Sequence, residues 1–222
     1  MSDAIYDELK QLLFARDFQM LERRLIETRW ERVHEEPWTS LLRAACYTSN
    51  AEDLVTWLRE KGFKPSPAIV SSTIELADNA IPVQLLIKGM DMDEINYKDE
   101  QGENYLFAAV EDGVLSYHML ESFSGEKGGN ERTNEILQSC QILTLLIKQG
   151  VRVNDRNLSG DTPLHRAVLY CWHGYSAANE AFARLLIEYG ADPLVSNKRG
   201  ETPLDYAIKY DNKELVALLT KQ

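Results

Sequence analysis

A nine-residue pattern occurs twice in the second half of the 222-residue chain and constrains its fold more than any other feature. It reads GDTPLHRAV over residues 160–168 and GETPLDYAI over residues 200–208. A second string precedes each copy, LLIKQGVRV at 145–153 and LLIEYGADP at 185–193, and LLIKGMDM at 85–92 is a further copy. Such recurrence indicates a stack of similar units, each of which buries its apolar surface against its neighbours.

The residue types in this pattern predict two helices in each unit. Thr162 and Thr202 are expected to be helix N-caps, because a threonine hydroxyl accepts a hydrogen bond from an unpaired backbone N–H. The proline after each threonine suits the first helical position, where its missing N–H costs nothing. A second helix is expected to end in Leu-Leu-Ile before Gly150 or Gly190, since glycine readily takes the left-handed conformation that closes a helix.

The string TPLH followed by an LLxxGADP-type ending resembles the ankyrin repeat, whose usual period is 33 residues. The resemblance implies an all-α fold, an ankyrin-repeat solenoid of stacked helix-turn-helix units joined by short hairpin loops. It covers roughly residues 36–222 and has its clearest motifs from residue 145 onward. Weaker copies are GENYLFAAV at 102–110 and TSLLRAAC at 39–46.

The same register divides the chain into an N-terminal capping helix pair and about five repeats. An apolar stripe at helical spacing is predicted in this helix pair, formed by Leu9, Leu12, Leu13, Phe18, Leu21 and Leu25. Two repeats carry insertions between their helices; in the longer one, the second helix is expected from about Thr133 to Gln149. The predicted units are 1–35 for the cap, then 36–65, 66–97, 98–155 with a long insertion, 156–195 with a short insertion, and 196–222 as the C-terminal cap.

The charge balance favours a protein partner over nucleic acid. There are 24 Lys and Arg residues against 35 Asp and Glu residues, which gives a net charge of −11. Nucleic-acid binding depends on basic residues that displace counterions, so no nucleic-acid partner is expected. A negative protein attracts a basic one at long range, so the expected partner is another protein, and a basic one suits this charge.

Cysteine usage and apolar runs bear on compartment. The three cysteines are widely spaced without a CxxC pair, which favours a reducing compartment over a disulfide framework. No basic segment followed by an apolar core begins the sequence, and no apolar run approaches the ~20 residues of a membrane span. We therefore expect a cytoplasmic protein without membrane association, and a monomer when alone.

No motif for catalysis stands out, and the expectation is a protein that is not an enzyme and needs no cofactor. The resemblance gives His165, the TPLH histidine, a structural hydrogen-bonding role. Cys171 and His173 lie two residues apart, but with His165 they lack a fourth ligand and a motif, so no metal site is predicted. An enzyme using Cys171 or His165 is the least favoured alternative.

An acidic run over residues 91–112 is the strongest candidate for a binding surface. The ankyrin register places residues 91–103 on a hairpin finger and residues 110–112 on a first helix, the two elements that line the concave groove in this family. A groove of one charge sign would speed the capture of an opposite partner, although a charge run is also what a solvated face looks like. The candidate acidic contacts are Asp93, Glu94, Asp99, Glu100, Glu103 and Glu111.

Two further groups of residues are candidate contacts. On the later fingers and the helices after them these are Leu158, Asp161, Arg166 and Arg199, and there Lys198 and Arg199 break the acidic pattern. In the shorter insertion they are Trp172 and Tyr175. Exposed aromatic residues often carry binding energy, but both could instead pack on neighbouring helices.

The leading functional hypothesis is a non-enzymatic module that binds a partner protein along its concave acidic face. Its sharpest form is a stoichiometric inhibitor or immunity-type protein that neutralises a basic enzyme or toxin. The alternative is a scaffold or effector-like adaptor with two surfaces, the groove and the insertion over residues 113–140. Mimicry of nucleic acid by the acidic run is a further reading that sequence leaves open.

Overall fold

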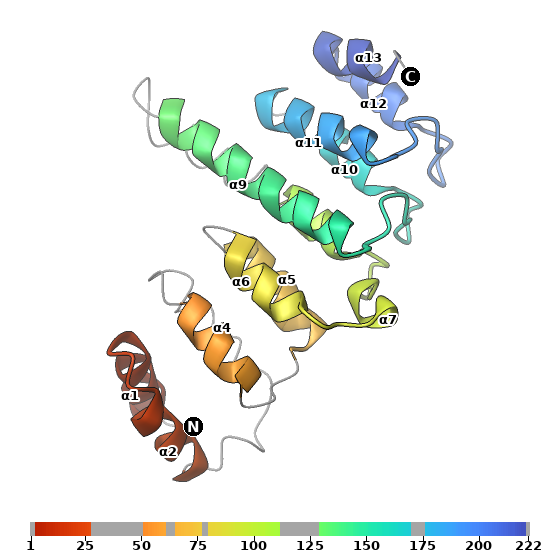
Figure 1. The fold of residues 1–222 in the computed structure, drawn as a ribbon. Helices are drawn as coiled ribbons and strands as arrows, with labels where there is room; N and C mark the ends of the chain where they lie inside the picture. Colours follow the sequence, from red (N-terminus) through yellow and green to blue (C-terminus); the bar gives the residue numbers. More distant parts are fainter. Residues whose placement is uncertain are drawn as a thin grey trace. The chain divides into compact units, whose positions relative to one another are not determined.

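The computed structural model describes residues 3–27, 51–60, 65–76, 80–111, 129–169 and 176–220. These residues form helices and connecting turns and contain no strand. They divide into two compact units, Met1–Gly89 and Met90–Gln222, called unit 1 and unit 2 below. The predicted all-α architecture of helical pairs is therefore confirmed for the described part of the chain (Figure 1).

Unit 1 is built from helices that pack in pairs. Helix α1 packs on α2, while α4 and α5 both pack on α6. Of the predicted apolar stripe, Leu9, Leu13 and Leu21 are fully buried, Leu12 and Phe18 are half-buried, and the Leu25 side chain lies outside the described residues. The bounds are α1 Asp3–Phe14, α2 Phe18–Glu27, α4 Ala51–Glu60, α5 Pro67–Leu76 and α6 Ala80–Ile87.

Unit 2 arranges its helices in two layers. The hairpins α10–α11 and α12–α13 each pair a first helix with a second one. The first helices α10 and α12 pack together in one layer, and α11 packs on both α9 and α13 in the other (Figure 1). The bounds are α7 Met92–Ile95, α9 Gly129–Lys148, α10 Pro163–Leu169, α11 Ser176–Glu188, α12 Pro203–Lys209 and α13 Lys213–Leu219, and residues 105–111 are also helical.

Local chemistry explains where these helices begin and end. Thr202 is the N-cap of α12, as its motif predicts, and the structure adds a capping box between Thr202 and Asp205. Thr162 accepts the His165 N–H at 3.4 Å at the start of α10. Gly150 and Gly190 have φ angles of 102° and 88°, which confirms their predicted left-handed role after α9 and α11.

One predicted boundary is wrong, and others lie outside the described residues. The placement of all of 91–103 on a hairpin finger is wrong for residues 92–95, which form α7. The Asp91 carboxylate accepts the N–H groups of Asp93 and Glu94 at 2.9 Å each, a capping arrangement that favours a helical turn. The predicted boundary between residues 35 and 36, and most of the long insertion, lie outside the described ranges.

Candidate functional site

Three loops of unit 2 share one turn geometry, and we call them finger 1 (residues 97–103), finger 2 (155–161) and finger 3 (195–201). In each, a backbone N–H donates to the carbonyl four residues later, at 3.0, 2.9 and 2.9 Å in fingers 1 to 3. A glycine at the turn has a φ of 76°, 81° or 78°, a conformation that favours glycine. The fingers therefore present equivalent positions to solvent.

A polar side chain at the base of each turn holds the finger in shape. In finger 1 an Asp99 carboxylate oxygen accepts the N–H groups of Gln101 at 2.9 Å and Glu103 at 2.8 Å. Asn157 and Asn197 do the same in fingers 2 and 3, with distances of 2.9 to 3.1 Å. Asp99 thus stabilises its own loop, so its charge serves the turn as well as the surface.

Backbone hydrogen bonds join each finger to the next at its tip. The Leu158 N–H donates to the Gln101 carbonyl at 2.7 Å, and the Lys198 N–H donates to the Ser159 carbonyl at 3.0 Å. These bonds set the fingers in register, so three pairs of residues follow one another along the stack. We call these pairs the fingertips: Glu100–Gln101, Leu158–Ser159 and Lys198–Arg199.

An asparagine side chain also bridges each repeat to the next. Asn96 donates to the Gly150 carbonyl at 3.1 Å and accepts the Arg152 N–H at 2.9 Å. Asn154 makes the same two bonds one repeat later, at 2.8 and 2.9 Å. Leu194 holds the equivalent place in finger 3 and is 70% exposed. These asparagines were not predicted as functional residues from the sequence, although each stands three residues before the Asp or Asn that shapes its finger.

Three of the predicted contacts form one cluster beside fingers 1 and 2. The Arg166 guanidinium bonds to the Glu103 carboxylate and, at 2.8 Å, to the Glu111 carboxylate, and it lies 5.6 Å from the centre of the Phe107 ring. Asn157 donates to Glu103 at 2.8 Å. Burial raises the pKa of Glu103 and outweighs the opposing effects of Asn157 and Arg166. These charges are therefore largely satisfied within the chain.

The remaining predicted contacts fall into distinct environments. Asp161 accepts a hydrogen bond from Asn197 at 2.8 Å, and Arg199 pairs with Glu201 at 2.8 Å. Asp93 and Glu94 are exposed on the first turn of α7, away from the fingertips in sequence. Trp172 and Tyr175 lie outside the described residues.

All six fingertip residues are exposed, and three of them give the tips an acidic, an apolar and a basic side chain. These are Glu100, Leu158, which is 63% exposed, and Lys198. Within the described ranges, no hydrogen bond or ion pair engages the side chain of Glu100 or Lys198. This row combines exposure with a fixed backbone, which is what a binding surface requires.

His165 links two repeats from a buried position. Its Nδ1 accepts the Thr162 N–H at 3.0 Å, so the proton of the neutral ring lies on Nε2, which donates to the Glu201 carbonyl at 3.1 Å. Burial lowers the pKa of His165 below its ordinary value. The geometry therefore supports a structural histidine and gives it no free nitrogen for catalysis.

We expect this histidine to make unit 2 less stable in mild acid. Because the folded-state pKa is lowered, the unfolded chain binds the proton more readily, and stability falls as pH drops through about 6.5 towards the folded pKa. Urea midpoints at about pH 7.5 and about pH 5.5 should therefore diverge more for the native protein than for His165→Gln. Equal pH dependence in both proteins would assign the effect to other groups, because Glu103 contributes equally to each.

Two other kinds of feature, a metal site and a membrane span, are absent from the described part of the chain. Those residues bring together no group of three or more His, Cys, Asp and Glu side chains that could hold a metal ion. Across the same ranges, every helix falls short of the length or apolar character that a membrane span requires.

Comparison with known proteins gives the fold a family context. Residues 135–222 match the family model described as ankyrin repeats, in 3 copies. The chain is 41% identical over 69 residues to a putative ankyrin repeat protein of Rickettsia bellii, which covers 30% of this chain and 36% of that protein. It is also 41% identical to protein phosphatase 1 regulatory subunit 27 of Homo sapiens over 80 residues. That match covers 36% of this chain and 47% of the human protein.

A solved structure extends the likeness to nearly the whole chain. The crystal structure of EF0377, an ankyrin repeat protein, matches with a TM-score of 0.62 at 19% identity and covers 96% of each chain. At that identity the likeness concerns the fold. Matches to the first curated relatives span about a third of their length, 36%, 32% and 33%.

Proposed function

Because this chain is an ankyrin-repeat protein, we propose that it is a non-enzymatic module that binds a partner protein through the fingertips of unit 2. Ankyrin repeats are interaction modules, and the architecture fixes the mode of binding without naming the target. The observation that carries the proposal is the backbone ladder, which holds Glu100, Leu158 and Lys198 in adjacent, exposed positions. A preordered surface of this kind loses little entropy on binding.

Ion pairs within the chain reduce the number of acidic side chains that are available to bind a partner. Glu103 and Glu111 bind Arg166, so they contribute less to an outward negative field than their number implies. Glu100 keeps an exposed carboxylate at the first fingertip, and Asp93 and Glu94 add two on α7. We therefore assign the specific contact with the partner to the fingertips. The net charge of −11 provides the long-range attraction of a basic protein.

The specific role that we propose is stoichiometric control of a basic enzyme or toxin. The negative net charge supports it, because opposite charges speed association. One of the relatives is named as a regulatory subunit of a phosphatase, so an ankyrin chain of related sequence is named for the control of an enzyme.

A site-directed capture experiment tests the module. A photo-crosslinking residue at position 158 should capture a protein from lysate of the source organism, and the same residue at position 184 on the outer helix α11 should not. Leu158→Asp should weaken capture at least about tenfold, since an exposed apolar anchor in a binding site contributes more than about 1.4 kcal/mol. Arg184→Glu is the matched control, because Arg184 is 54% exposed and pairs with Glu180 on its own helix.

The opposite pattern would reject the fingertips as the contact surface. Crosslinking from position 184 but not from 158, with capture unchanged by Leu158→Asp, would place binding on the outer helices. Absence of any captured protein, together with turnover in an activity screen, would favour the enzyme alternative.

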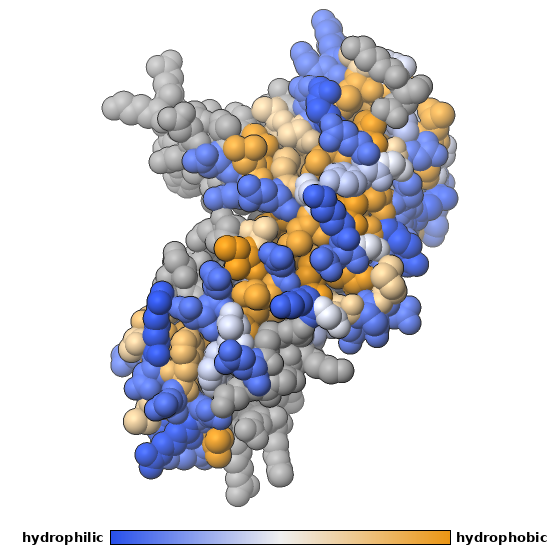
Figure 2. Space-filling view, in the orientation of Figure 1, coloured by the Kyte–Doolittle hydropathy of each residue, from blue (hydrophilic) through white to orange (hydrophobic). Residues whose placement is uncertain are grey.

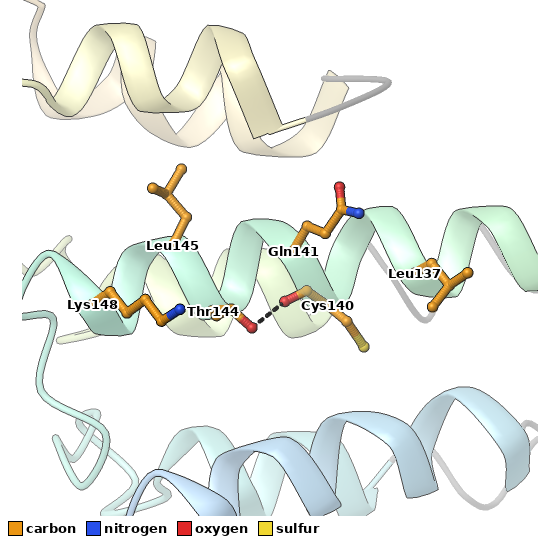
Figure 3. A pocket seen from close by; sticks show the side chains of 6 residues that line it. All are labelled: Leu137, Cys140, Gln141, Thr144, Leu145 and Lys148. Atoms are coloured by element: carbon orange, nitrogen blue, oxygen red, sulfur yellow. Dashed lines mark hydrogen bonds between the residues drawn. The ribbon is translucent and has the colours of Figure 1, made fainter.

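A hollow on α9 supports a second candidate function, an adaptor with two surfaces. Figure 2 shows orange apolar residues among blue ones on the face that carries α9 and α11. The hollow has a volume of about 380 Å³ and Leu137 beside it is 54% exposed (Figure 3). Burial raises the pKa of the Cys140 thiol to about 11, so this cysteine acts as an apolar lining group. The lining residues described are Leu137, Cys140, Gln141, Thr144, Leu145 and Lys148.

The same capture experiment separates the two candidates. A crosslinking residue at position 137 should trap a second, different protein if the chain is an adaptor. It should trap nothing if the fingertips are the sole contact surface.

A further inference from the structure

We infer that the fingertips recognise a linear segment of the partner in which an apolar side chain lies between one basic and one acidic side chain. This inference rests on the proposed function and adds the chemistry of the partner. It follows from the order of the exposed side chains along the ladder, which changes from acidic to apolar to basic.

The order of the three fingertips is fixed by the backbone. Because Leu158 N–H bonds to Gln101 and Lys198 N–H bonds to Ser159, the second fingertip must lie between the first and the third. Glu100 therefore lies on one side of Leu158 and Lys198 lies on the other. A partner segment that covers Leu158 with an apolar side chain brings its flanking residues over charges of opposite sign.

The charges beneath the fingertips are already paired, so they do not erase this polarity. Lys98 lies 3.4 Å from the Asp155 carboxylate and donates to the Arg156 carbonyl. Arg156 donates to the Ser196 carbonyl at 2.6 Å and to the Gly160 carbonyl. Internal partners hold these cations in the body of the fingers, whereas Glu100 and Lys198 keep their full charge for an incoming molecule.

The third fingertip carries a second cation that strengthens the same polarity. Arg199 follows Lys198 in this fingertip, although Glu201 pairs with it at 2.8 Å. A segment with two charges of one sign would meet one like charge, and such a contact costs binding energy and suppresses the wrong partner.

Short synthetic peptides on the full chain test this order. The probes are peptides with leucine flanked by lysine and glutamate, by two lysines, or by two glutamates, with one to three glycines as spacers. Binding is measured by fluorescence anisotropy at low salt. We expect the mixed-charge peptides to bind about tenfold more tightly than either like-charge set, and this preference to shrink as salt screens exposed charges.

Charge reversal at one fingertip should redirect the preference. Lys198→Glu makes both outer fingertips acidic and should favour the two-lysine peptides, while Glu100→Lys should favour the two-glutamate peptides. Arg184→Glu on α11 is the control and should leave the preference unchanged. All three side chains are exposed, so the variants should unfold at the same temperature as the native protein.

Several results would overturn the inference. Equal binding of all three peptide classes, a preference that survives both reversals, or no binding up to millimolar peptide would each reject the proposed chemistry. Those results leave the capture experiment at position 158 standing, so failure of the partner chemistry is distinguishable from failure of the binding module itself.

Discussion

Replacement of Gly160 by alanine is expected to destabilise unit 2 by about 3 kcal/mol, because two penalties add. Gly160 has a φ of 81°, which is unfavourable for a residue with a Cβ atom. A Cβ there would also lie 2.9 Å from the Lys198 backbone nitrogen and 3.3 Å from the Asn197 carbonyl carbon. Relief of this clash must move finger 3 and weaken the bond between Lys198 and Ser159.

The chain offers a matched control with the same backbone conformation. Gly200 has a φ of 78°, but a Cβ there would meet nothing within 4 Å. Gly200→Ala should therefore cost only the conformational penalty of about 1 kcal/mol. Gly102→Ala should fall between the two, since its Cβ would lie 3.2 Å from the Leu158 nitrogen. Urea unfolding measures all three, and equal losses would show that contact between fingers contributes little to stability.

Replacement of Arg166 by methionine is expected to be the second most damaging change. It would remove the Arg166 cation that Glu103 and Glu111 bind, and the Arg166 and Glu103 side chains are only 18% and 16% exposed. Loss of one partner from a buried ion pair costs about 3–5 kcal/mol, and the partial exposure here reduces the expectation to about 2 kcal/mol. Urea denaturation of the native and variant proteins gives this difference directly.

Two controls test whether the loss of stability in Arg166→Met comes from unpaired buried charge. One removes an exposed ion pair, and the other is a double variant. Arg184→Met removes a pair on α11 whose side chains are 54% and 35% exposed, and it should cost no more than about 0.5 kcal/mol. If Arg166→Met lowers the free energy of unfolding because Glu103 is left as an unpaired buried carboxylate, Glu103→Gln in the same chain should recover part of that free energy. A loss at position 166 as small as that at 184 would mean that water already solvates the cluster.

The helices were more predictable than the surface. Thr202, Gly150 and Gly190 act through bonds and backbone angles that depend on a few neighbouring residues, so the sequence pattern alone located them. The start of α9 was placed too late, at Thr133 instead of Gly129, because the insertion carries no capping signal to mark it. Residues 92–95 were misassigned because family register was given more weight than the local Asp-x-x-Glu capping signal.

The binding surface was harder to predict because it depends on contacts between distant residues. Glu103 and Arg166 are 63 positions apart, and nothing in a run of acidic residues reveals that a cation from the next repeat reaches back to it. The same holds for Asp161 and Asn197, which are 36 positions apart. Charge patterns therefore overestimated the free negative surface. The candidate contact Leu158 is exposed, and its position in the finger could be predicted because the turn depends on neighbouring residues.

Three polar side chains reach from one repeat to the backbone of the next. In the repeat of finger 2 these are Asn154, Arg156 and His165, and each bonds to backbone of the repeat that follows. In the repeat of finger 3 the same positions hold Leu194, Ser196 and Asp205, and Asp205 instead caps its own helix. Polar contacts to the following backbone thus add to the apolar packing between repeats, and substitution at these positions could change one contribution without the other.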